Sequence, residues 1–278
     1  MRAGNMASCG VIAPARYPLL APVGHGGQAM VWRTRDHKKF SLFPLVIKFL
    51  HPRFMHDKAA RNAFAREAQV MASGGEAWGP RLYESVTQAE HPYLVREYSV
   101  GVPLRPLERN IPRNRVLLWL RDIAQALSRL HASGWIHGDV KPSNIICRAH
   151  APARLVDFGS AYPRFDMAHD PAPWSGWQAP VWGSKDYQPH QEDAGNAASY
   201  DTRRDLFALA VMVHEVFVGR HPFRGGREPE FHPPTGISKT VWRRIVCALA
   251  LDPAVRRNGP VWMLGGQGGL NWPMGRGA

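Results

Sequence analysis

The sequence predicts an α+β fold with two lobes, a small β-rich N-terminal lobe with one helix and a larger, mainly helical C-terminal lobe. Short apolar runs separated by turn residues dominate residues 16–98 and are typical of strands. Two long amphipathic patterns follow, at residues 116–132 and 200–218, and these favour helices. The chain has 278 residues, of which 45% are hydrophobic, and this suits one globular unit.

A glycine-rich stretch, Gly24-His-Gly-Gly-Gln-Ala-Met-Val31, lies at the start of the strand-rich region. Glycine lets backbone N–H groups close over phosphate oxygens without a collision at Cβ. The stretch therefore favours a phosphate-binding loop, although an ordinary hairpin turn is an equal alternative on these residues alone.

A buried strand is expected at residues 45–50, and it carries Lys48 within a β-branched run. A lysine at such a position is costly to bury without an acidic partner. The next segment, residues 57–73, favours a helix with Asp57 as its N-cap. Two further strands are expected, at residues 80–86 and 93–98.

The helical pattern at residues 116–132 has apolar residues at alternating spacings of four and three, which give one apolar stripe. It leads into a polar loop that contains Asp139, Lys141 and Asn144. In such a loop a carboxylate can accept the proton of an attacking hydroxyl, and a lysine can neutralise charge on a phosphoryl group in transfer.

Two short strands after this loop, at residues 145–147 and 155–156, are expected to form a hairpin. The hairpin would return Asp157 to a position beside Asn144. Mg²⁺ takes few protein oxygens and keeps its other positions for water and phosphate. One oxygen from each residue therefore predicts a magnesium site, and the whole arrangement favours phosphoryl transfer.

These motifs resemble those of the protein kinase family. The family's catalytic loop reads His-Arg-Asp-x-x-x-x-Asn and is followed by Asp-Phe-Gly. Here the chain reads His137-Gly-Asp-Val-Lys-Pro-Ser-Asn144 and then an unaltered Asp157-Phe-Gly159. Lysine and proline after the aspartate are similar to the serine/threonine branch in bacteria. The resemblance runs from about Leu19 to Arg256 and implies a kinase N-lobe at residues 16–98, a C-lobe at 99–257 and a Gly/Trp-rich tail at 258–278.

The resemblance also implies the roles of the site residues, with ATP and Mg²⁺ as cofactors and Mn²⁺ as an alternative metal. A glutamate on the helix at 57–73 should pair with Lys48 and hold the α- and β-phosphates. Glu67 is the inward candidate, whereas Glu76 and Glu84 are weaker alternatives. The implied catalytic residues are Asp139, Lys141, Lys48 and Glu67; the nucleotide-binding residues are Gly24, Gly26, Gly27, Val31, Lys48, Glu97, Ser99, Asn144 and Asp157; the metal ligands are Asn144 and Asp157.

Residues 93–101 resemble the hinge between the kinase lobes, where backbone groups of Glu97 and Ser99 would bind the adenine edge. Arg96 falls at the position that guards the back of this pocket, where the family prefers an apolar side chain or threonine. Ala29 likewise replaces the third glycine of the family's loop. Both departures put the shape of the nucleotide site in doubt.

The segment after Gly159, up to about residue 189, takes the place of the kinase activation segment. It contains no threonine. Gly138 replaces the arginine that reads a phosphorylated segment in the family, so we predict activity that does not depend on phosphorylation at Ser160 or Ser175. The resemblance further implies that the hydroxyl residue Ser184 touches the catalytic aspartate.

Departures also occur later in the chain. His190 stands where the family has a glutamate, although Arg256, the usual partner of that glutamate, is present. Asp205, which opens the helix at 200–218, matches the family's aspartate that supports the catalytic loop, but a first-turn aspartate favoured by the helix dipole is an equal alternative. A last amphipathic helix is expected at residues 241–251, and no final helix is evident after it.

The predicted function is an ATP-dependent serine/threonine protein kinase that uses Asp139 as its base. Its partner would be a protein with a serine or threonine acceptor. Two alternatives remain: a small-molecule phosphotransferase related to aminoglycoside or choline kinases, and a pseudokinase that binds nucleotide without turnover.

The composition argues against several other classes. The net charge of +13 favours acidic partners, but no basic run interleaved with aromatic residues predicts specific nucleic-acid binding. The three cysteines show no pairing or zinc spacing. The longest apolar stretch, residues 206–218, is too short to span a bilayer, and the apolar run before Pro14 is too short for a secretory signal. We therefore expect a soluble, cytoplasmic protein.

Overall fold

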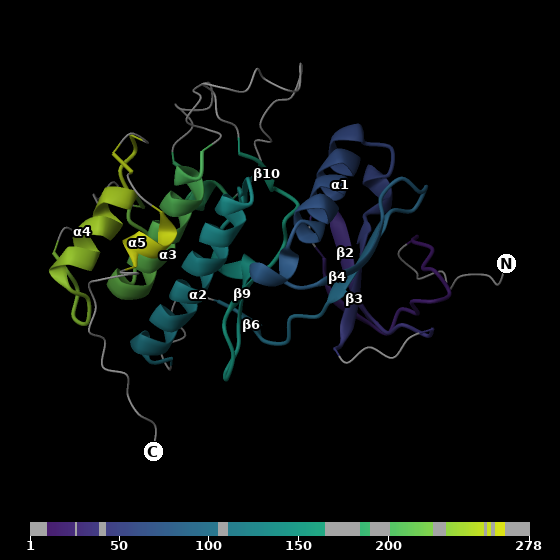
Figure 1. Cartoon of the computed structure of the whole chain (residues 1–278), viewed down its shortest axis with the longest axis horizontal. Helices are drawn as coiled ribbons and strands as arrows, with labels where there is room; N and C mark the ends of the chain where they lie inside the picture. Colours follow the sequence, from purple (N-terminus) through teal and green to yellow (C-terminus); the bar gives the residue numbers. More distant parts are fainter. Residues whose placement is uncertain are drawn as a thin grey trace.

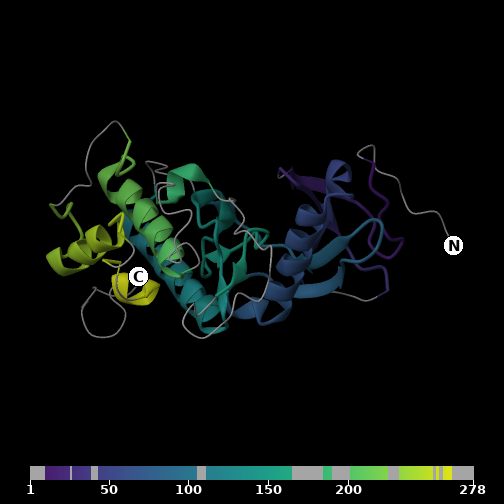
Figure 2. The same cartoon turned by 90° about the horizontal axis from the view of Figure 1, so that it is seen from above.

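The structure, a computed structural model, describes residues 10–25, 27–38, 43–104, 111–164, 184–189, 201–224, 232–252, 255–256 and 259–264. Its two lobes lie at opposite ends of the molecule. Both views place the largest sheet and α1 at one end and α2, α3, α4 and α5 at the other (Figure 1, Figure 2). The predicted bilobal α+β fold is therefore confirmed.

The N-terminal lobe is built on one antiparallel sheet with the strand order β1-β2-β3-β5-β4. In the register of the sheet, Lys48 on β3 pairs with Val31 on β2 and with Leu94 on β5. All six residues of β3 are buried, as its continuous apolar pattern predicts. The strands are β1 (Ala21–His25), β2 (Ala29–Thr34), β3 (Leu45–Leu50), β4 (Leu82–Val86) and β5 (Tyr93–Glu97).

Helix α1 (Lys58–Ala72) packs against this sheet and carries Glu67 on its buried face. The predicted N-cap is confirmed, because the Asp57 side chain accepts hydrogen bonds from the backbone N–H groups of Ala59 and Ala60. Two 3₁₀ turns flank the helix: η1 (Pro52–Phe54) and η2 (Gly75–Ala77).

The C-terminal lobe surrounds two long helices, α2 (Arg113–Ala132) and α3 (Arg203–Val218). Their apolar faces meet in one continuous core. Helix α2 begins three residues before the predicted start. The predicted hairpin is also present, because Ile145 on β8 pairs with Leu155 on β9. The smaller elements are β6 (Val102–Pro103), β7 (Trp135–Ile136), η3 (Pro142–Asn144), β8 (Ile145–Cys147), β9 (Arg154–Leu155), β10 (Tyr162–Pro163) and η4 (Lys185–Tyr187).

The end of the described chain adds one short helix that the sequence did not predict. Helix α4 (Lys239–Ala248) is the expected amphipathic helix, and α5 (Pro260–Met263) follows it. Proline at the first position favours this turn, and Met263 and Leu264 are buried in the C-terminal core. Among the described helices, none combines the length and the apolar character needed to cross a membrane.

Candidate active site

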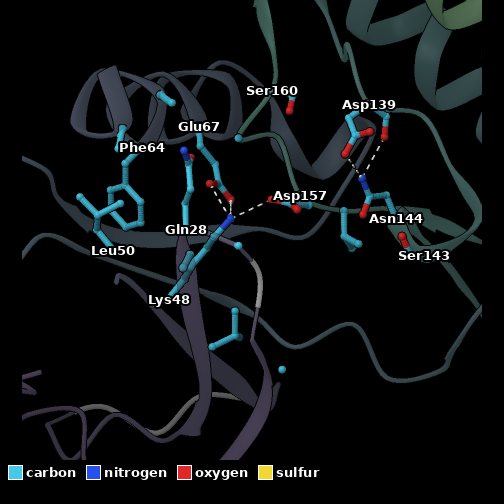
Figure 3. Close-up of a pocket in the computed structure, with 18 of the residues that line it drawn as sticks. Gln28, Lys48, Leu50, Phe64, Glu67, Asp139, Ser143, Asn144, Asp157 and Ser160 are labelled. Carbon is cyan, nitrogen blue, oxygen red and sulfur yellow. Dashed lines mark hydrogen bonds and ion pairs between the residues drawn. The ribbon is translucent and has the colours of Figure 1, made fainter. Parts of the chain in front are cut away.

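A cavity of about 430 Å³ lies between the two lobes. Its walls come from the β1–β2 hairpin, β3, α1, the loop at residues 139–144 and the segment at residues 156–160. Figure 3 shows the polar side chains that converge on it from both lobes. Nine of the predicted site residues line this cavity: Gly24, Gly27, Val31, Lys48, Glu67, Asp139, Lys141, Asn144 and Asp157.

Lys48 connects the two lobes by ion pairs. Its Nζ atom lies 2.8 Å from Oε1 and 2.7 Å from Oε2 of Glu67, and 2.8 Å from Oδ1 of Asp157. In Figure 3 the lysine side chain rises from β3 and ends between the two carboxylates. The other two glutamates that the sequence offered lie elsewhere: Glu76 pairs with Arg81, and Glu84 accepts from Arg16, Tyr17 and Tyr93.

The charges of this cluster depend on one another. The positive charge of Lys48 holds the pKa of Asp157 well below its usual range. Burial by itself lowers the pKa of Lys48, but the charges of Asp157 and Glu67 outweigh burial and the net shift is upward. Burial raises the pKa of Glu67, and Lys48 opposes this shift without cancelling it. Lys48 and Asp157 are therefore both charged at neutral pH.

The Asp139 carboxylate is held from three sides. Its Oδ2 atom lies 2.7 Å from Nζ of Lys141 and accepts a hydrogen bond from Nδ2 of Asn144 at 3.1 Å. Its Oδ1 atom accepts from the backbone N–H of Ser184 at 2.9 Å. The expected contact from Ser184 is thus made by its backbone, and no hydrogen bond from its hydroxyl occurs among the described residues. These bonds fix the carboxylate at the edge of the cavity.

Asp205 supports the loop that carries Asp139. The Asp205 side chain is 1% exposed and accepts hydrogen bonds from the backbone N–H groups of His137 and Gly138, at 2.8 and 2.9 Å. Nε2 of His131 lies 2.8 Å from the same carboxylate. The loop-supporting alternative therefore describes Asp205 better than the helix-dipole alternative. Sequence reasoning missed His131, although its place in the last turn of α2 offered a signal.

Asp157 has an unusual backbone conformation, with a φ of 65°. It is the only non-glycine residue with positive φ among the described residues, and such strain is typical of functional sites. The next residue, Phe158, is 1% exposed and packs edge-on against His137, with ring centroids 5.2 Å apart. Burial of this ring directs the Asp157 side chain towards the cavity.

Asn144 and Asp157 suit a divalent cation. The amide nitrogen of Asn144 donates to the backbone and side-chain oxygens of Asp139, which leaves its Oδ1 atom for a metal. The Asp157 side chain is 51% exposed, and only its Oδ1 atom is engaged by Lys48. Hard oxygens of this kind are the ligands that Mg²⁺ prefers.

The predicted hinge residues Glu97 and Ser99 do not face the cavity in the way that the resemblance implies. Glu97 and Ser99 are not among the residues that line the cavity, and the Glu97 side chain turns away to pair with Arg154 at 2.6 Å. Arg96, by contrast, does line it. The predicted residue Gly26 lies outside the described residues, as do Ser175 and His190.

Gly138 leaves no room for a side chain. Its φ is +76°, and an added Cβ would lie 2.7 Å from the Ser160 carbonyl oxygen and 2.9 Å from the Tyr162 ring. The ring therefore occupies space next to the position where the family carries arginine.

Some cavity residues were not predicted from the sequence. Gln28 lies at the tip of the β1–β2 hairpin, and Phe64 projects from α1 beside Leu50 (Figure 3). Ser143 and Ser160 complete the wall from the C-terminal lobe. These residues lack a distinctive motif, so only the folded structure identifies them.

The bilobal fold and this cluster define a class of phosphotransferases, and comparison with known proteins identifies the family. The model of the protein kinase domain matches residues 17–243, so the chain belongs to the protein kinase family. The chain is 31% identical over 262 residues to the serine/threonine-protein kinase PknB of Mycobacterium tuberculosis, covering 87% of this chain and 40% of PknB. It is 30% identical over 215 residues to the serine/threonine-protein kinase PknL of the same organism, covering 76% of this chain and 51% of PknL.

A probable serine/threonine-protein kinase of Clostridium perfringens, CPE1738, is 29% identical over 221 residues, covering 78% of this chain and 30% of that relative. The chain thus spans about half or less of the length of these relatives. The solved kinase domain of M. tuberculosis PknI has the same fold, with a TM-score of 0.66 and 21% identity, over 93% of this chain and 97% of that one.

Proposed function

We propose that this chain is a serine/threonine protein kinase that transfers the γ-phosphoryl group of ATP to protein hydroxyls. The observation that carries the proposal is the Lys48–Glu67–Asp157 cluster, which faces Asp139 and Asn144 across one cavity. The names of PknB and PknL support serine and threonine as acceptors. The lobes of the proposed kinase comprise residues 16–98 and 99–257, with a tail from residue 258.

In this proposal the chain acts chiefly by positioning and by neutralising charge. Lys48, held by Glu67, binds the α- and β-phosphates, and the glycine-rich hairpin covers them. Asn144 and Asp157 hold Mg²⁺, which supplies charge neutralisation when bound. Asp139 orients the acceptor hydroxyl and takes its proton, while Lys141 stabilises the phosphoryl group in transfer.

Activity in this proposal does not depend on phosphorylation of the activation segment. The three side chains of the Lys48–Glu67–Asp157 cluster all lie outside the activation segment. The crowding around Gly138 supports the same view, because it leaves no place for an arginine that would read a phosphate.

The proposal is tested by transfer of ³²P from γ-labelled ATP with Mg²⁺ to a generic protein substrate. We expect label on serine and threonine, and we expect Asp139→Asn to lower the rate by about 10³-fold. Label on a small hydroxylated molecule alone would favour the aminoglycoside-kinase class. Nucleotide binding without any transfer would favour a pseudokinase.

A further inference from the structure

Arg96 is a charged side chain on the wall of the cavity. It lies near the end of β5, where it pairs in register with Val46 on β3 and Leu82 on β4. The apolar side chains of Val31 and Val156 also line the cavity. Burial lowers the pKa of Arg96, whereas the nearby charges of Glu67 and Asp157 raise it. A guanidinium remains charged in such surroundings.

The guanidinium of Arg96 makes one hydrogen bond among the described residues. Its Nη1 atom donates to the backbone carbonyl oxygen of Glu97 over 3.3 Å. The carboxylates of Glu67 and Asp157 are engaged by Lys48 instead. A guanidinium has five N–H donors. Arg96 is half-buried and lines the cavity, so the donors that make no hydrogen bond within the described residues are open to hydrogen-bond acceptors of a ligand in the cavity.

The two purine bases differ in what they offer to these donors. Adenine has a donor, the 6-amino group, beside the N7 acceptor, whereas guanine has two acceptors, O6 and N7. The resemblance to kinases implies that backbone groups of Glu97 bind the adenine edge, and in the structure the Glu97 carbonyl oxygen accepts a hydrogen bond from Arg96. An arginine that contacts O6 and N7 together is the commonest way in which proteins read guanine.

We propose that Arg96 shifts the base preference of the nucleotide site towards guanine and makes GTP a phosphoryl donor alongside ATP. This inference rests on the proposed function only in that it takes the cavity to be the nucleotide site. The reaction is unchanged: the bond from the β-phosphate bridging oxygen to the γ-phosphorus breaks, and the acceptor hydroxyl forms the new bond and loses its proton to Asp139.

The test measures the ratio of affinities for fluorescently labelled GTP and ATP, in the presence of Mg²⁺, for the wild-type chain and Arg96→Met. We expect the substitution to lower the GTP-to-ATP affinity ratio by about fivefold or more, the low end of what a bidentate guanidinium contact gives. If Arg96 only supported the fold, its substitution would weaken the binding of GTP and ATP equally and leave their affinity ratio unchanged. A fall smaller than about fivefold, or a rise, would overturn the proposal.

Two further variants separate the causes. Arg96→Lys keeps the positive charge but loses the planar fork, so we expect it to behave like the methionine variant. Wild-type preference in Arg96→Lys would show that charge alone acts, against the proposal. Arg154→Met is the matched control, because Arg154 contacts the side chain of Glu97 and not its carbonyl oxygen. The GTP-to-ATP affinity ratio of Arg154→Met should therefore equal that of the wild type.

Binding and transfer are scored separately. If the binding ratio depends on Arg96 but no ³²P transfer occurs with either nucleotide, the base preference stands, whereas the donor role of GTP and the kinase proposal both fail. If transfer occurs and the ratio ignores Arg96, the kinase proposal stands and the inference fails. If the wild-type chain binds neither nucleotide, both are wrong.

Discussion

Glu67 and Asp205 are buried to nearly the same extent, at 2% and 1% exposed. Different contacts offset the cost of burying the two carboxylates. Glu67 forms its ion pair with Lys48, which it shares with Asp157 of the other lobe. Asp205 accepts hydrogen bonds from two backbone N–H groups and lies against the ring of His131.

The pKa values of these two carboxylates shift in opposite directions. Burial raises the pKa of Glu67 beyond what Lys48 can offset. Burial also acts to raise the pKa of Asp205, but its hydrogen bond to His131 and the other nearby donors outweigh burial, and the net shift is downward. The comparison separates a buried carboxylate of the proposed reacting cluster from one that holds the backbone of the loop at residues 137–138.

The largest expected effect follows from removing the cation of the first carboxylate. In Lys48→Met we expect kcat/KM for phosphoryl transfer to fall by about 10³-fold, because the phosphates lose their main positive contact. Glu67 would take up a proton instead of staying charged, so the free energy of unfolding should change by less than about 2 kcal/mol. Steady-state kinetics and denaturant unfolding measure the two quantities. Equal losses of activity and stability would contradict this separation.

In Asp205→Asn we expect the reverse, a large loss of stability with a smaller loss of activity. The asparagine keeps one acceptor oxygen but loses the charge, and hydrogen bonds to a charged group are worth more than neutral ones. We expect the free energy of unfolding to fall by about 3 kcal/mol. Denaturant unfolding checks this value. An unchanged free energy with lost activity would show that Asp205 acts in the reaction and not in the framework.

A glycine pair tests how tightly the loop supported by Asp205 is packed. Gly138 and Gly134 both have positive φ, but an added Cβ meets other atoms only at Gly138. We expect Gly134→Ala to cost about 1 kcal/mol for backbone strain alone. Gly138→Ala should cost about 2 kcal/mol more, from the contacts with Ser160 and Tyr162. Similar unfolding free energies for the two variants would mean that the loop shifts to make room.

The pH dependence of stability should have opposite signs at the two carboxylates. The folded-state pKa of Asp205 is lowered, so its contribution is present above the unfolded pKa and is lost as the pH falls. The stability difference between the wild type and Asp205→Asn should therefore shrink from pH 6 to pH 3. The folded-state pKa of Glu67 is raised, so its contribution is full at acid pH and is lost as the pH rises through that pKa.

The difference between the wild type and Glu67→Gln should accordingly change in favour of the wild type as the pH falls over the same range. For each variant, the difference in unfolding free energy from the wild type can change by at most about 1.4 kcal/mol per pH unit, the value for one proton. Denaturant unfolding at several pH values measures both differences. Slopes of the same sign would contradict the comparison.

Much of the fold followed from local patterns. The N-cap at Asp57 and the hairpin that returns to Asp157 depend on neighbours in the chain, and the structure contains both. The motif residues Lys48, Glu67 and Asn144 were identified because the family fixes their order along the sequence. The structure gathers them around one cavity.

Other features depend on contacts that no local pattern encodes. The bond from Arg96 to the Glu97 carbonyl depends on which way a long side chain turns at the wall of the cavity. The contact of His131 with Asp205 joins α2 to α3 across 74 residues of sequence. Burial of Met263 in the C-terminal core likewise arises from packing against distant helices, and a glycine-rich context gave no sign of it.

In the proposed function the active site is assembled without phosphorylation of the activation segment. The most direct measurement is the time course of ³²P transfer to a protein substrate by chain that has been treated with phosphatase and verified as unphosphorylated by mass spectrometry. We predict full activity from the first time point, lost in Asp139→Asn and unaffected by Ser160→Ala with Ser175→Ala. A lag that preincubation with Mg²⁺ and ATP removes, or an inactive dephosphorylated chain, would contradict the account.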